Sequence, residues 1–276
     1  MRTPSVGGAR FVRSSDQSLL VYFDQPRASG ATNRADQPAL AQDHGRTSLV
    51  EANESVRRLL QLLDSRPIAG VHNLHPAYCS LLVKFDALKS GHEEVEGKLR
   101  EYLEQLQEVR LPEPRLVEIP VCYGEELGPD LQDVAQMHGV TPEQVIQLHT
   151  ATTYLVYFLG FVPGFAYLGE LPKALVTPRH ATPRRKVPAG SVGIAGNQTG
   201  VYPCETPGGW QLLGRTPLAM LNLEFASANP GTRLRPDRDG LSLLSIGDRV
   251  HFKAISREQF AIRQSDAGPS DARQNA

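Results

Sequence analysis

A dense set of glycines and prolines between residues 158 and 221 constrains the fold of this chain more than any other feature. The stretch reads FLGFVPGFAYLGELPKALVTPRHATPRRKVPAGSVGIAGNQTGVYPCETPGGWQLLGRTPLAML. Glycine adopts backbone angles that other residues avoid, and proline fixes φ and removes a backbone donor. Because neither suits a helix interior, we expect short strands joined by tightly specified loops, which hold side chains and amides at defined points.

The sequence around this stretch also predicts short strands. Helical periodicity disappears after about residue 150, and short apolar runs separated by turn residues occur at 154–158, 191–195, 211–214, 241–244 and 249–252. This pattern favours a small barrel or sandwich. Two short helices should come before it. The first ends at Gly139, a typical C-terminal cap, and the second begins with a capping box made by Thr141 and Gln144.

The first half of the chain alternates between helical and extended periods. Apolar spacing predicts helices at 51–64 and 92–108, and strands at 19–23, 68–73, 81–85 and 117–121. This order suggests a ferredoxin-like α+β layer, with two helices on one face of an antiparallel sheet.

We therefore predict an α+β chain of two domains, with disordered ends. The expected ranges are an N-terminal ferredoxin-like α+β domain at 10–112, a C-terminal β-barrel domain at 113–262, disorder at 1–9 and 264–276, and a long surface loop at 27–45.

Composition excludes several classes of function. The net charge of −1 lacks the basic excess of a nucleic-acid binder, and no apolar run approaches the roughly 18 residues of a membrane span. The three cysteines, Cys79, Cys122 and Cys204, are odd in number and form no CxxC pair, which fits a reducing compartment and offers no zinc signature. We expect a cytoplasmic protein with no nucleic-acid or membrane partner.

Basic, amide and aromatic side chains in the glycine- and proline-rich stretch are candidates for binding a substrate. The guanidinium fork suits carboxylate or phosphate, an amide pairs with a lactam edge, and tryptophan offers an apolar wall. Equally, the basic cluster could be a solvated loop tip and the tryptophan a plug in the core. The candidate substrate-binding residues are Arg179, Arg184, Lys186, Gln198, Tyr202, Trp210 and Arg215.

The glycines of GSVGIAGNQTG allow two interpretations. Gly190, Gly193 and Gly196 could present backbone amides to an anion, or they could mark bends and bulges of a barrel strand. The spacing matches neither a phosphate loop nor a dinucleotide fingerprint. No catalytic residue or metal site stands out, since His149 and His180 lack an acid partner at a diagnostic spacing. His149 fits a structural histidine at a helix end.

Several long segments resemble a known family. The motifs occur in the order typical of the KipI / allophanate hydrolase subunit 1 family, which comprises the B subunits of 5-oxoprolinase. In chain order they are IPVCYGEELGPDLQDVA, EQVIQLHTA, GFVPGFAYLGEL, PRHATPRRKVPAGSVGIAGNQTGVYP and TPGGWQLLGRTP. The resemblance runs from about residue 15 to 255. It implies a small α+β N-terminal domain and a C-terminal cyclophilin-like β-barrel, without isomerase activity.

The resemblance also implies a function. Members act as a non-autonomous part of an ATP-dependent 5-oxoprolinase that converts 5-oxo-L-proline to L-glutamate. The direct partner is the C subunit, of the KipA / allophanate hydrolase subunit 2 type, and the A subunit completes the set. ATP is used by the complex, and this chain shows no metal site or biotin attachment motif. The alternatives are a KipI-type inhibitor of a sensor histidine kinase, or one component of an allophanate or urea carboxyltransferase-type complex.

Overall fold

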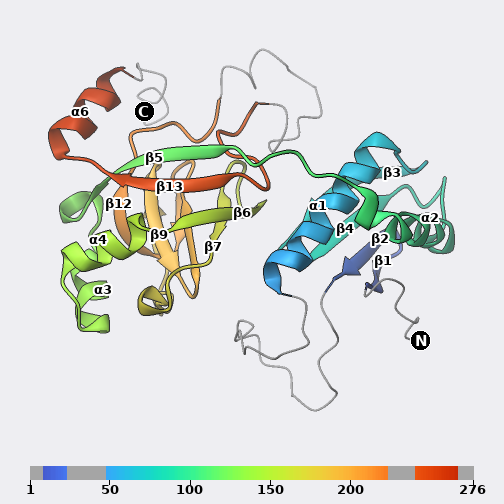
Figure 1. Ribbon diagram of the computed structural model, residues 1–276, viewed down its shortest axis with the longest axis horizontal. Coiled ribbons are helices and arrows are strands. Elements are labelled where there is room, and N and C mark those ends of the chain that lie inside the picture. The colour runs from blue at the N-terminus through green and yellow to red at the C-terminus, as the bar shows by residue number, and fades with distance from the viewer. Residues whose placement is uncertain (1–8, 24–47, 223–239, 267–276) are drawn as a thin grey trace. The chain divides into compact units, whose positions relative to one another are not determined.

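The computed structural model describes residues 9–23, 48–222 and 240–266 (Figure 1). The chain divides into two compact units, Met1–Glu113 and Pro114–Ala276. The loop predicted at 27–45 lies outside the described residues, and so does most of the disorder predicted at the two ends. Ala9 is buried, and helix α6 (Arg257–Asp266) continues past the start of the predicted C-terminal disorder.

A four-stranded antiparallel sheet forms the first unit, in the order β1-β2-β4-β3. Its strands are β1 (Arg10–Ser15), β2 (Ser18–Tyr22), β3 (Val71–Pro76) and β4 (Ser80–Phe85). Every second residue of β4 is buried, which is the period of a strand with one covered face.

The strand predicted at 117–121 does not belong to this sheet. Strand β5 (Leu116–Tyr123) pairs instead with strands of the second unit, while β1, which the sequence did not reveal, takes the edge beside β2. Alternation identifies a strand but not the sheet that it joins. The ferredoxin-like order is therefore not confirmed.

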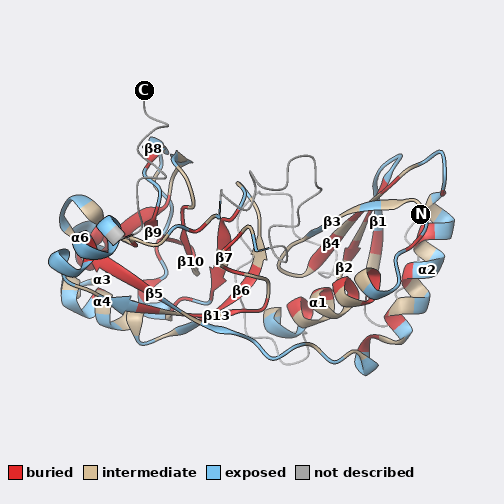
Figure 2. Ribbon diagram, turned by 90° about the horizontal axis from the view of Figure 1, so that it is seen from above, coloured by how far each residue is buried: buried red, intermediate tan, exposed pale blue. Residues whose placement is uncertain are grey.

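Two helices cover one face of the sheet (Figure 2), and both were predicted. They are α1 (Leu49–Ser65) and α2 (His92–Glu104), the latter followed by a 3₁₀ turn at Leu106–Glu108. Ser48 and Glu51 form a capping box that starts α1 by satisfying two of its free amides. Leucines and valines at three- and four-residue spacing face the sheet, so burial of this stripe holds the layer together.

Seven strands of the described residues close into a barrel, in the order β10-β7-β6-β13-β5-β12-β9. Besides β5 they are β6 (Thr153–Leu159), β7 (Ala166–Gly169), β9 (Ser191–Ala195), β10 (Gln198–Val201), β12 (Gln211–Arg215) and β13 (Arg249–Ala254). Strands β5 and β13 run parallel, side by side in Figure 1.

The predicted barrel is thus confirmed, whereas its closer description as cyclophilin-like stays a prediction. The prediction of a strand at 241–244 is wrong, because this segment contributes only an isolated bridge between Leu221 and Ser242. A short apolar run does not by itself show that a neighbouring strand is available to pair with it.

Helices α3 (Leu131–His138) and α4 (Pro142–Thr150) pack on the barrel, and their predicted ends are confirmed. Gly139 ends α3 in a left-handed conformation with φ of 65°. Thr141 and Gln144 form the predicted capping box of α4. Local residue chemistry was sufficient here because both signals lie within a few residues of the helix ends.

An outer layer lies on β9, β10 and β12, on the side away from the barrel interior. A two-stranded ribbon, β8 (Arg184–Val187) and β11 (Thr206–Gly208), contributes Val187 to a cluster with Phe165, Tyr202 and Trp210. A Cβ at Gly193 or Gly200 would come within 3.2 Å of Trp210. These two glycines, paired across β9 and β10, therefore let the indole lie against the strands.

A pair of glycine substitutions tests the close packing of Gly128 against strand β12. An alanine Cβ at Gly128 would lie 1.9 Å from the carbonyl oxygen of Leu213, whereas Gly97, exposed on α2, has nothing within 4 Å. We expect Gly128→Ala to lower the free energy of unfolding by about 3 kcal/mol. Gly97→Ala should raise it by about 0.5–1 kcal/mol, through helix propensity. Urea denaturation measures both, and equal effects would contradict the packing at Gly128.

Candidate functional site

A buried carboxylate, Asp130, organises the outer face of the barrel. Its side chain is 3% exposed, and Oδ1 accepts a hydrogen bond from Nη2 of Arg184 at 2.5 Å. Oδ2 accepts from the backbone N–H of Leu212 at 2.6 Å, while the Asp130 N–H donates to the Leu212 carbonyl at 3.0 Å. One carboxylate thus joins the start of α3, the ribbon strand β8 and the barrel strand β12.

His180 adds a third group to this junction. Its Nε2 lies 3.3 Å from Oδ2 of Asp130, within ion-pair distance but without the alignment of a hydrogen bond. The backbone N–H of His180 donates to the Gly209 carbonyl at 2.8 Å, which fixes the loop beside Trp210. The acid partner that the sequence did not show is therefore Asp130, 50 residues away in the chain.

Arg184 serves structure in this arrangement. A buried carboxylate costs several kcal/mol unless charged and hydrogen-bonding groups surround it. Arg184 supplies the charge, so its guanidinium is committed to Asp130. Sequence reasoning missed Asp130, although the Gly-Pro-Asp run at a helix start offered a signal. Asp130 holds the N-cap position of α3 but makes no capping bond with its side chain.

The aromatic candidates form a wall beside this junction. Trp210 meets Phe165 edge-on, with ring centroids 5.4 Å apart, and Tyr202 meets the same ring at 5.2 Å. Burial raises the pKa of Tyr202 to about 12, so its hydroxyl stays protonated. Trp210 is a buried core residue, since it is only 5% exposed. This fits the second of the two interpretations offered by the sequence. The exposed Arg179 lies over the Trp210 ring, with the guanidinium carbon 6.0 Å from the ring centroid.

Two other candidates, Lys186 and Gln198, make other contacts. Nζ of Lys186, on the ribbon, lies 2.9 Å from Oε1 of Glu205, and both side chains are exposed. Such a pair contributes little, about 0–1 kcal/mol, to stability. Gln198 begins β10, half-buried, opposite Gly169 and Ala195. The structure therefore brings Arg179, Arg184, Tyr202 and Trp210 together but not Lys186 or Gln198.

The glycine amides are used within the protein. Gly190 and Gly196 have φ of 79° and 57°, and their N–H groups donate to the carbonyls of Tyr202 and Thr177 at 2.7 and 2.6 Å. Gly193 lies inside β9, between two antiparallel neighbours. Two of these amides are thus already hydrogen-bonded, and the glycines fit the interpretation as bends and close-packing positions.

A sealed hydrogen-bond chain crosses the barrel interior at His149. Its Nδ1 lies 2.8 Å from the hydroxyl oxygen of Tyr123, and its Nε2 lies 2.9 Å from Oγ1 of Thr199. Thr199 donates its hydroxyl proton to the Gly193 carbonyl at 3.1 Å, so it accepts from Nε2–H, and Tyr123 donates to Nδ1. Burial lowers the pKa of His149 to about 3, so the imidazole is neutral. Because His149 is 0% exposed, a substrate cannot reach the His149–Thr199 pair.

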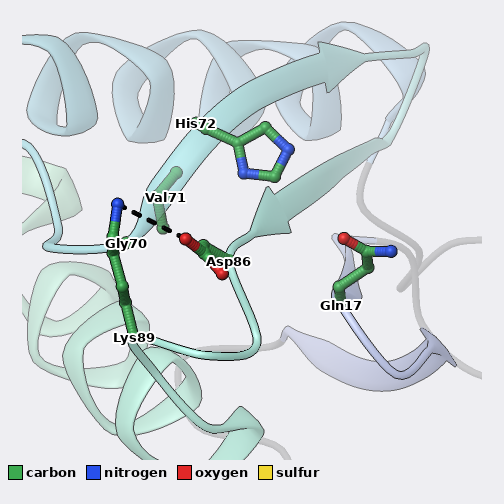
Figure 3. Close-up of a pocket in the computed structure, with 6 residues that line it drawn as sticks. All are labelled: Gln17, Gly70, Val71, His72, Asp86 and Lys89. Atoms are coloured by element: carbon green, nitrogen blue, oxygen red, sulfur yellow. Dashed lines mark ion pairs between the residues drawn. The ribbon is translucent and has the colours of Figure 1, made fainter.

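A hollow of about 350 Å³ lies in the first unit (Figure 3), lined by Gln17, Gly70, Val71, His72, Asp86 and Lys89. The dashed line in Figure 3 marks the ion pair between Lys89 and Asp86, whose Nζ and Oδ2 atoms lie 3.3 Å apart. Oδ1 of Asp86 accepts from the Leu88 N–H, and this bond is the main reason that the pKa of Asp86 is lowered. The charged groups of the hollow, Asp86 and Lys89, thus stabilise a local turn.

Two searches concern only the described parts of the chain. Within 9–23, 48–222 and 240–266, no group of three or more His, Cys, Asp or Glu is placed to hold a metal ion. In the same ranges, no helix combines the length and apolarity needed to cross a bilayer.

The fold and site define an α+β protein built on a closed barrel, with a charged junction on its outer face. Residues 10–230 match the family model described as "Carboxyltransferase domain, subdomain C and D". The chain is 42% identical over 224 residues to the B subunit of 5-oxoprolinase from Bacillus subtilis (strain 168), covering 76% of this chain and 88% of that protein. It therefore belongs to the carboxyltransferase subdomain C and D family, within the group of KipI and 5-oxoprolinase B subunits.

Solved structures extend the comparison. The crystal structure of TTHA0988 in space group P212121 matches with a TM-score of 0.59 and 36% identity, over 74% of this chain and 37% of that one. The urea amidolyase of K. lactis matches with a TM-score of 0.69 at 16% identity, over 96% of this chain and 16% of that one. At that identity the likeness shows the fold alone. This chain spans well under half of both solved chains.

Removing the charge of Asp130 tests the junction. We expect Asp130→Ala to lower the free energy of unfolding by about 1–3 kcal/mol, because the Leu212 N–H loses its acceptor and Arg184, which is 30% exposed, loses its counter-charge. Asp130→Asn keeps an acceptor for the Leu212 N–H and should cost less. Glu118→Gln, which breaks an exposed 3.2 Å pair with Lys253, is the matched control and should change stability by under about 1 kcal/mol. Urea denaturation measures all three, and equal losses would refute the role of Asp130.

The neutral His149 predicts a dependence of stability on pH. Its pKa is about 3 in the folded chain against an ordinary value of 6.5. As pH falls below 6.5, the unfolded chain gains a proton that the folded chain does not. The free energy of unfolding should therefore fall by up to about 1.4 kcal/mol per pH unit from this group. His149→Gln removes this contribution, so the stability difference between the proteins should shrink from pH 7 to pH 5. Parallel pH profiles would contradict the assignment.

Proposed function

We propose that this chain is the B subunit of a 5-oxoprolinase, a complex that uses ATP to open 5-oxo-L-proline to L-glutamate. The observation that carries the proposal is the 42% identity to the 5-oxoprolinase B subunit of Bacillus subtilis, which covers most of both chains. A relative from Escherichia coli O157:H7 with the same name is 53% identical over 141 residues, although it spans only 51% of this chain.

The geometry supports a protein that does not act alone. The Thr199–His149 pair has the appearance of a nucleophile and its base, but it is buried and its hydroxyl proton goes to a carbonyl. Burial also raises the pKa of Cys204, which disfavours a thiolate nucleophile there. We infer that the C subunit, which is the KipA-type protein, completes the site as direct partner and that the A subunit joins the complex.

Two glycine amides of this chain that could have held ATP phosphates are already occupied. A triphosphate needs several free amides or cations, and the N–H groups of Gly190 and Gly196 are already donated to protein carbonyls. We therefore propose that another member of the complex handles ATP. The chain's own contribution is to bind and orient substrate. Of the predicted arginines, Arg184 is paired with Asp130, which leaves Arg179 and Arg215 as the candidates for contact with substrate.

The location and the alternatives follow from the same observations. All three cysteines lie in the described residues and none forms a disulfide, which fits the proposed cytoplasmic location. A role in urea carboxylation has the distant urea amidolyase in its favour, but only at the level of the fold. Kinase inhibition remains the other hypothesis.

Reconstitution tests the proposal. The purified chain alone should release no glutamate from 5-oxoproline, because the His149–Thr199 pair is buried and the proposed site is completed by the C subunit. With the A and C subunits and ATP, glutamate should appear, and omission of any one component should abolish it. The measurement is glutamate release, together with co-elution of this chain with the C subunit on gel filtration.

Two results would contradict the proposal. Turnover by the isolated chain would refute a composite site. Absence of glutamate from the full mixture, while a known B subunit supports turnover with the same A and C preparations, would refute the oxoprolinase assignment. Inhibition of kinase autophosphorylation in that case would favour the KipI-type alternative.

A further inference from the structure

Arg215 carries a charge that the described residues do not neutralise. Its guanidinium is half-buried at the end of β12, and its Nε is sealed from solvent without a hydrogen-bond acceptor. Within the described ranges, no carboxylate lies within ion-pair distance of it. Burial lowers the pKa of Arg215, and no neighbouring charge contributes to that shift. Among the described residues, Arg215 therefore bears the cost of desolvation without a compensating partner.

Other arginines of this unit contrast with it. Arg115 and Arg184 each reach a buried aspartate, Asp248 and Asp130 respectively. Even the exposed Arg257 pairs with Glu125 and Glu126. A buried polar group without a partner is uncommon in folded proteins and calls for an explanation. A binding site is one such explanation, since binding sites retain polar groups that lower stability until the ligand binds.

The surroundings of Arg215 are built for close approach. Gly190 has φ of 79°, and a Cβ there would lie 2.5 Å from the Thr216 carbonyl oxygen and 3.3 Å from Cγ of Arg215. The arginine stem therefore packs on the turn at Gly190, at a position that only glycine allows. The N–H of Gly190 donates to the Tyr202 carbonyl, so this turn adds no free amide beside the guanidinium.

We propose that Arg215 is the binding site for a monoanionic carboxylate and, resting on the proposed function, that it holds the carboxylate of 5-oxoproline. A guanidinium matches a carboxylate in charge and in its two-pronged geometry. A phosphate carries more charge and is held by several cations or by free amides at a turn. Among the described residues, no other charge contributes at Arg215, and the Gly190 amide is occupied, so carboxylate is favoured.

The isolated chain provides the first test, independent of activity. Arg215→Met keeps the apolar stem and removes the desolvated charge, so the midpoint of thermal unfolding should equal that of the wild type or rise by about 2–4 °C. A clear fall in the midpoint would show that Arg215 has a structural partner and would overturn the proposal. Lys253→Met, at an exposed pair with Glu118, is the matched control for loss of a positive charge.

The second test uses the full mixture of the A, B and C subunits with ATP, and compares 5-oxoproline with its carboxamide. The wild type should prefer the carboxylate. Arg215→Met should lower kcat/KM for 5-oxoproline by about 100-fold and change that for the carboxamide little, because a charged hydrogen bond is lost for one substrate only. Arg215→Lys should recover part of the preference, and Lys253→Met should keep all of it.

The outcomes separate the two proposals. If the wild-type mixture works but Arg215→Met lowers both substrates equally, the carboxylate assignment is overturned and the proposed function stands. If the wild-type mixture makes no glutamate, both the proposed function and the identification of 5-oxoproline as the ligand of Arg215 are refuted. The thermal comparison would still decide whether Arg215 carries an unpaired charge.

Discussion

The burial of Asp130 is the constraint on which the outer face of the barrel depends. A carboxylate that is 3% exposed is tolerated only with a counter-charge and hydrogen-bond donors, and these come from Arg184 on the ribbon and Leu212 on β12. The need to satisfy this one group therefore fixes the ribbon against the barrel. Trp210 and Tyr202 then fill the space between the two layers.

The two faces of strands β9 and β10 serve different purposes. The inner face closes over the neutral His149 and its hydrogen-bond chain, which exclude solvent and substrate. On the outer side, glycines admit the Trp210 ring, and charged groups lie on the loops and strand ends around it. A chain that buries His149 inside the barrel and carries charged groups on the outer face is suited to present a surface, which agrees with the proposed role as one part of a composite site.

Much of the fold could be predicted from the sequence, and little of the site. The caps at Gly139 and Thr141 were readable because their physics is local. Strand β5 was assigned to the wrong sheet, because side-chain alternation carries no information about the pairing partner. The seven predicted substrate-binding residues were chosen by type alone. Only the structure shows that Arg184 has a carboxylate and that Arg215 lacks one among the described residues.

By itself, the sequence determined the types and ends of most elements, the barrel in the second half and the family, since these depend on short-range periodicity and long ordered motifs. The tertiary structure alone decided which charges are neutralised. Asp130 and Arg184 are 54 residues apart, and His149 and Thr199 are 50 apart. Burial and pairing arise from contacts between distant segments, so the cost of a charge is set by surroundings that no local pattern encodes.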